Sequence, residues 1–150
     1  KFQLFKIPYL LQIYSIKYAG TPFIANTTFI REKNGPISIE IYNALENLSN
    51  QGYIKQQIVD NPKYGHQKHA FSLAKKVSKF DFSQGEEIFL DNFLPELLPL
   101  THDKLKKLAY ATEPMLEIQK KERDEKILKG AMIDFSRVSV DPDVVDVYSD

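Results

Sequence analysis

The stretch PISIEIYNALENLSNQGYIKQQIVDNPKYGHQKHAFSL, residues 36–73, decides the fold more than any other part of the chain. Its first third repeats apolar residues at spacings of four, four and three, which predicts one buried face of a helix. These residues are Ile37, Ile41, Leu45 and Leu48. Pro36 suits the first turn of such a helix, and Asn50-Gln51-Gly52 is typical of its end. We therefore expect a helix over 36–50 that faces the core.

Two β-strands are predicted directly after this helix, over 53–58 and 68–73. The segment between them contains Pro62 and Gly65, which favours a loop over a tight turn. The order of helix, Gly-Tyr-Ile and hairpin is typical of the second half of a winged helix. The expected fold class is α+β and mostly helical, with a winged-helix-like centre and a small β-hairpin or sheet.

The segment before this stretch predicts a further helix and a strand. Apolar and aromatic residues from Ile7 to Tyr18 predict a helix that is buried on most sides, starting near Lys6 to Pro8 and stopping at Gly20. The β-rich residues within 23–31 predict a short strand, which Asn34-Gly35-Pro36 ends in a turn.

The segment after the hairpin predicts three short helices. Ser83 and Glu86 have the spacing of a capping box, Thr101 suits a helix cap, and Glu113-Pro114 predicts a helix start. From residue 139 onward the chain has four acids and no base. We expect one domain over 1–138, followed by an acidic C-terminal tail over 139–150.

The charge of the chain is unevenly distributed, although 20 Lys and Arg balance 20 Asp and Glu over the 150 residues. Residues 1–79 hold 11 basic and 4 acidic residues, a net charge of +7. Residues 80–150 hold 9 basic and 16 acidic residues, a net charge of −7. Such a division favours recognition of a charged partner or internal pairing of the two halves.

Sequence motifs for catalysis are scarce. The absence of cysteine excludes thiol nucleophiles, disulfides and cysteine-based metal sites. His66 and His69 lack obvious further ligands for a metal, and Glu87 and Asp91 fit a solvated helix turn better than an acid–base pair. We predict no catalytic residue, no cofactor and no metal. No apolar run approaches the roughly 18 residues that a membrane span needs, so we expect a cytoplasmic protein.

Nucleic-acid binding is an alternative that the hairpin region raises. Its lysines Lys55, Lys63 and Lys68 could rest on phosphates, which require positive charge but no particular sequence. In DNA-reading proteins of this type, the preceding helix enters the major groove. Here that helix has no Lys or Arg and carries Glu40 and Glu46 instead. This pattern favours protein contacts, and a winged-helix DNA-binding regulator remains the alternative hypothesis.

A family resemblance rests on two N-terminal motifs. Residues 5–23, FKIPYLLQIYSIKYAGTPF, and residues 29–38, FIREKNGPIS, are similar to the opening of the Panacea antitoxin domain of the SocA-like family. Ile41-Tyr42 and Gly52-Tyr53-Ile54 fit the next helix and its exit. Residues 108–115 resemble a late motif of the family, from which the chain departs at Thr112-Glu113 and Pro114-Met115. The resemblance extends over residues 5–135.

The resemblance implies a mainly helical, non-enzymatic protein-interaction domain. Members neutralise a cognate protein toxin by direct contact, some present the toxin to a protease, and a chaperone is a further partner to consider. The family also occurs in prophage and other mobile-element proteins. The carried-over positions are Gly35 and Pro36, which would set a helix start, together with Thr112, Glu113 and Pro114.

Overall fold

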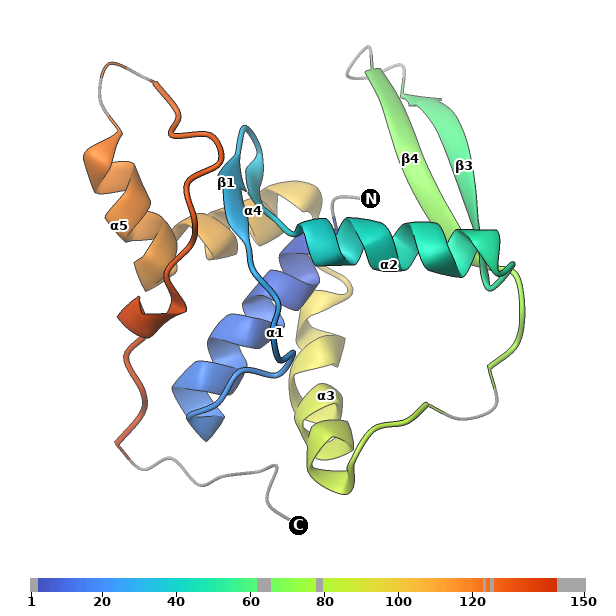
Figure 1. Cartoon of the computed structure of the whole chain (residues 1–150), viewed down its shortest axis with the longest axis horizontal. Coiled ribbons are helices and arrows are strands. Elements are labelled where there is room, and N and C mark those ends of the chain that lie inside the picture. The colour runs from blue at the N-terminus through green and yellow to red at the C-terminus, as the bar shows by residue number, and fades with distance from the viewer. Residues whose placement is uncertain (1–2, 62–65, 78–79, 123, 125, 143–150) are drawn as a thin grey trace. The chain divides into compact units, whose positions relative to one another are not determined.

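The computed structural model describes residues 3–61, 66–77, 80–122, 124 and 126–142 (Figure 1). The chain divides into two compact units. One unit runs from Ile39 to Asp81, and the other comprises the flanking segments, up to Ser38 and from Phe82 onward. We call them the hairpin unit and the helical unit and describe each by itself.

The helical unit is built around α1 (Gln3–Ala19), which contacts α3, α4 and β2 (Figure 1). Tyr9 and Leu10 of this helix are completely buried. The predicted stop is confirmed, because Gly20 has a φ of 79° and donates its N–H to Ile16. The predicted start is wrong. Pro8 lies inside the helix, whose earlier residues are held by burial of Phe5 and by a hydrogen bond from Lys6 to Pro36.

The first sheet corrects the prediction for Pro36. Strands β1 (Ile30–Glu32) and β2 (Gly35–Ile37) pair antiparallel, with Arg31 opposite Pro36, so Pro36 and Ile37 belong to a strand. Proline fits a strand edge as well as a first helical turn, because in both places its missing N–H is tolerated. Gly35 has a φ of 111°, which no helix accepts. The next helix therefore begins only at Ile39.

The three helices predicted after residue 80 are confirmed as α3 (Gln84–Leu97), α4 (His102–Tyr110) and α5 (Glu113–Lys121). Ser83 and Glu86 form the predicted capping box, and the Thr101 hydroxyl accepts the Lys104 N–H. Pro114 starts α5, as expected. Local side-chain to backbone bonds of this kind depend on near neighbours alone.

The segment after α5 completes the core of the helical unit. The N–H groups of Arg31 and Ile133 donate to Ala131 and Phe29, so residues 131–133 run beside β1. Phe135, in the short 3₁₀ helix η1 (Phe135–Arg137), packs against Tyr9 and Phe29. Ile133 and Val138 are buried. The expected boundary at residue 138 stays a prediction, and residues 143–150 lie outside the described part.

The hairpin unit consists of α2 (Ile39–Asn50), β3 (Ile54–Asn61) and β4 (His66–Leu73). The two strands pair antiparallel from Ile54 opposite Leu73 to Asn61 opposite His66, which confirms the predicted hairpin and lengthens it. The expected buried face of α2 is wrong. Ile41 and Leu45 are only half-buried and Leu48 is exposed, and within the described part of this unit the element that α2 packs against is β3.

The mostly helical α+β fold class is confirmed, with five helices and two small antiparallel sheets in the described part. The winged-helix-like character of the centre stays a prediction. Of the helices in the described ranges, each is too short or too polar to cross a lipid bilayer.

Candidate functional site

The described part of the hairpin unit has no buried core. Among its described side chains, none between Ile39 and Asp81 is buried. The helix α2 exposes three large apolar side chains, those of Ile39, Tyr42 and Leu48, and it carries no Lys or Arg. Removing large apolar side chains from water lowers the free energy of the system. Such a surface is therefore a candidate for binding a partner.

One side of the hairpin carries four apolar side chains around a polar pair. The strand register places Ile54, Gln56 and Ile58 of β3 on the same side of the sheet as His69, Phe71 and Leu73 of β4, because cross-strand partners share a face. We call the four apolar residues among them the hairpin face: Ile54, Ile58, Phe71 and Leu73. Ile58 is 59% exposed and Leu73 is 65% exposed. The opposite face is polar and is formed by Lys55, Gln57, Ala70 and Ser72.

Contacts at the base of the hairpin hold the ends of its two strands together beside the end of α2. The Lys75 ammonium group lies 4.9 Å from the centre of the Tyr53 ring and donates to the carbonyl oxygen of Gln51 at 2.9 Å. The Ala74 N–H donates to the carbonyl oxygen of Tyr53 at 2.8 Å. In Figure 1, the strands leave the C-terminal end of α2 and extend away from this helix. The far part of the hairpin face therefore stands clear of α2.

Two of the three predicted nucleic-acid contacts, Lys55 and Lys68, belong to the strands of the same hairpin. Lys55 is exposed on the polar face. Lys68 belongs to β4 opposite Val59, but its side chain lies outside the description, and Lys63 lies outside the described residues altogether. The ring of His69 is hydrogen-bonded to the amide of Gln56, with a distance of 2.7 Å between Nδ1 and Nε2.

The helical unit contains a largely buried polar cluster around Arg31. Its guanidinium donates twice to the carboxylate of Glu122, at 3.1 and 3.2 Å, and once to the hydroxyl of Tyr110 at 2.7 Å. The side chains of Arg31 and Glu122 are 5% and 13% exposed. The Arg31 hydrogen bond holds the pKa of Glu122 below its usual range. This cluster joins β1 to α4 and to the segment after α5.

The family positions Gly35 and Pro36 lie against Lys6. The Lys6 ammonium donates to the carbonyl oxygen of Pro36 at 2.9 Å, and a Cβ atom added at Gly35 would come within 2.8 Å of Lys6 Cε. Burial of Lys6, reinforced by the charges of Lys106 and Arg31, lowers its pKa to about 7. The role that the resemblance gave to Gly35 and Pro36 is corrected here, because they form β2 rather than a helix start.

The late family positions surround the start of α5. The Thr112 hydroxyl lies 2.7 Å from the Tyr9 hydroxyl and donates to the carbonyl oxygen of Ala109. Glu113 accepts two hydrogen bonds from Ser139, which lower the pKa of its carboxyl. Pro114 is completely buried. The structure thus places all five family positions in the helical unit, and each has a contact that stabilises its packing.

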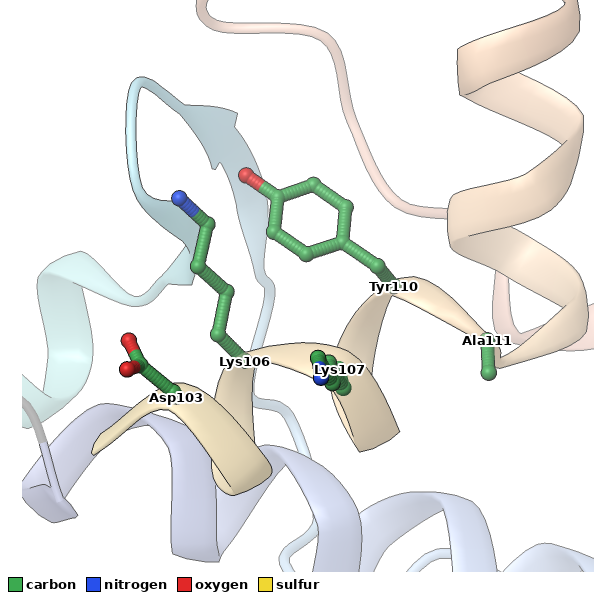
Figure 2. A pocket seen from close by; sticks show the side chains of 5 residues that line it. All are labelled: Asp103, Lys106, Lys107, Tyr110 and Ala111. Atoms are coloured by element: carbon green, nitrogen blue, oxygen red, sulfur yellow. The ribbon is translucent and has the colours of Figure 1, made fainter. Parts of the chain in front are cut away.

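A surface hollow of about 480 Å³ lies along α4 (Figure 2). Its lining comes entirely from this helix and its end: Asp103, Lys106, Lys107, Tyr110 and Ala111. In Figure 2, Lys106 and Tyr110 point to the same side, whereas the carboxylate of Asp103 turns away from them. In the described ranges, no three His, Asp or Glu side chains are grouped to hold a metal ion. The hollow therefore offers little to position a small substrate.

The sequence pattern did not reveal the hairpin face or the Arg31 cluster. The spacing of Ile54 and Ile58 in the first strand, and of Phe71 and Leu73 in the second, places each pair on one strand face and was a partial signal for it. The pairing of Arg31 with Glu122 joins residues 91 positions apart, and no local pattern signals it.

The fold and its surfaces define a mostly helical α+β protein in which one helix and one hairpin, α2 and β3–β4, expose several large apolar side chains. The chain belongs to the family described as "Antitoxin SocA-like, Panacea domain", whose profile matches residues 4–114. This match confirms the resemblance and ends earlier than the expected residue 135. No curated protein matches the chain, and no solved structure does either.

Proposed function

We propose that this chain is the antitoxin of a toxin–antitoxin pair and neutralises a protein toxin by binding it directly. The family match over residues 4–114 is the observation that carries this proposal. The proposal gives the chain no catalytic role, since neutralisation by binding needs contact area and affinity rather than reacting groups. It places the chain in the cytoplasm, with a protease or chaperone as a further partner of the complex.

The described surface supports a role in protein binding. Apolar side chains of α2 and of the hairpin face are exposed, and exposed apolar groups of this size supply much of the free energy of protein association. The buried charges of the helical unit are engaged in its own packing. Arg31 is paired with Glu122, and Lys6 is bonded to Pro36.

Co-expression tests this function. The product of the gene beside this one is expressed in a host with and without the chain, and growth and co-purification are measured. We expect the neighbour to arrest growth, the chain to restore it, and the two proteins to purify as a complex. Arrest with neither rescue nor complex formation would overturn the proposal. A catalytically inactive form of the neighbour should still co-purify, because binding does not require its activity.

A winged-helix DNA-binding regulator is the second candidate function. It is favoured by exposed Lys55 and by the six lysines and single acid within residues 53–79. It is disfavoured by α2, which carries Glu40 and Glu46 and no base. Titration of duplex DNA tests it, because phosphate contacts make affinity fall steeply with salt. Absence of binding at low salt would eliminate this candidate.

A further inference from the structure

We infer that the hairpin face is the surface that holds the toxin, and that the toxin presents an apolar patch bordered by carboxylates. This inference rests on the proposed function and adds the surface and the chemistry of the partner. It is carried by the apolar exposure of the hairpin, by its position in the unit and by the charge of the surrounding chain.

The apolar exposure is concentrated on one side of an otherwise polar element. Ile58 and Leu73 expose 59% and 65% of their surface, whereas the opposite face presents Lys55 and Gln57. A two-stranded hairpin is at best marginally stable in water unless a third strand or a helix covers it. Within the described residues, β3 and β4 pair only with each other. The helix α2 contacts β3, and a protein partner packed on the hairpin face would add a further layer to the two strands.

The position of the face leaves it accessible within its unit. The helix α2 contacts β3, and the Tyr53 to Lys75 contact fixes the base of the hairpin beside the end of α2. Ile54 is accordingly half-buried, whereas Ile58, four residues further along β3, is exposed. Leu73, which pairs with Ile54 at the base, is exposed as well, so Ile58 and Leu73 offer apolar surface to a partner at both ends of the face.

The charge of the hairpin segment indicates the chemistry of the occupant. Residues 53–79 contain six lysines, no arginine and one acid, a net charge of +5, and the described side chains of Lys55, Lys75 and Lys76 are exposed. Carboxylates at the border of the partner would complement this charge, speed the encounter and disfavour basic partners. A nucleic acid would satisfy the lysines but would leave Ile58 and Leu73 in water, since phosphates offer no apolar contact.

Binding measurements on matched variants test this surface. The chain and the product of the neighbouring gene are titrated by calorimetry, using wild type, Ile58→Asp, Leu73→Asp and Ile88→Asp. Ile88 on α3 is the matched control, because it is an isoleucine with 50% exposure outside the hairpin unit. We expect each hairpin variant to raise the Kd about tenfold or more and the control to leave it unchanged. Circular dichroism checks that all variants remain folded.

A second variant tests the charge without changing the hairpin face. Lys55→Glu, on the polar side, should slow association and reduce the dependence of the rate on salt. If wild type binds the neighbour and Ile58→Asp, Leu73→Asp and Lys55→Glu all bind it equally well, the inferred surface is overturned. The proposed function would then remain intact. If wild type neither binds the neighbour nor rescues growth, both the inferred surface and the proposed function are overturned.

Other occupants of the hairpin face give different results. Light scattering measures whether the isolated chain forms a dimer. If it does, and if Ile58→Asp dissociates the dimer, the face binds a second copy of the chain and the inference is overturned. If the chain binds duplex DNA, and if Lys55→Glu abolishes this binding while Ile58→Asp leaves it unchanged, the hairpin binds nucleic acid. This result would also overturn the inference.

Discussion

Lys6 donates a hydrogen bond of 2.9 Å from its buried ammonium group to the carbonyl oxygen of Pro36. The bond joins the first turns of α1 to β2 through two residues that are 30 positions apart in sequence. It accounts for a helix that begins before Pro8, because the side chain ties that turn to the sheet. It also makes the stability of the helical unit sensitive to the protonation of one lysine.

The pH dependence of stability is the first prediction. The pKa of Lys6 is about 7 in the folded chain against an ordinary value of 10.5, so between these values the unfolded chain binds more protons. The free energy of unfolding should therefore rise with pH above 7, by about 1–2 kcal/mol up to pH 9. Urea unfolding at several pH values measures this rise. Lys6→Met should flatten it, and an equal rise in that variant would contradict the prediction.

The second prediction concerns Gly35. Its φ of 111° and the approach of Lys6 Cε to 2.8 Å both disfavour a side chain. Gly35→Ala should lower the free energy of unfolding by about 2–4 kcal/mol, from backbone strain and overpacking together. Gly130→Ala is the matched control, because Gly130 has a φ of 80° with no atom within 4 Å of the added Cβ. Its expected cost is about 1 kcal/mol. Thermal or urea unfolding compares the two, and equal costs would argue against the contact with Lys6.

The third prediction concerns the ion pair of Arg31 and Glu122. Glu122→Ala leaves a guanidinium that is 5% exposed without its carboxylate, which should cost about 3–5 kcal/mol. Glu122→Gln should cost less, since its amide oxygen can still accept a hydrogen bond from Arg31. Urea unfolding at pH 7 measures both variants, and a cost below 1 kcal/mol for Glu122→Ala would refute the pair's role.

Acid should weaken the same pair. The folded pKa of Glu122 lies below its ordinary value of 4.5, so its contribution is complete above that value and is lost as the pH falls through the folded pKa. The difference in stability between wild type and Glu122→Gln should therefore shrink at low pH. A difference that stays constant down to pH 2 would contradict this assignment.

The elements that could be predicted from sequence are those fixed by near neighbours. Ser83 and Glu86 bond across three residues, and Gly20 ends α1 through its own backbone conformation. Both features depend on local geometry and are confirmed. The hairpin was likewise predictable, because strand alternation and the Pro and Gly of its loop lie within one short stretch.

The elements that could not be predicted depend on distant partners. Pro36 suits a helix start or a strand edge equally, and the pairing of Arg31 opposite Pro36 together with the bond from Lys6 selects the strand. The apolar repeat of α2 resembles a core stripe, and periodicity alone cannot tell a core from a partner surface. The hairpin face becomes definite only when the strand register and the exposure of its side chains are known.

The last prediction tests the segment that follows the family match. Ile133 is 3% exposed, and its N–H donates to Phe29, whereas its neighbour Met132 is 70% exposed. Ile133→Ala should cost about 2–5 kcal/mol, because it leaves a cavity beside β1. Met132→Ala should change stability by less than about 0.5 kcal/mol. Urea unfolding of the two variants compares adjacent positions in one segment. Similar costs would mean that residues 131–133 do not pack as a core strand, and a large cost at Ile133 alone would make the chain beyond Pro114 part of the folded core.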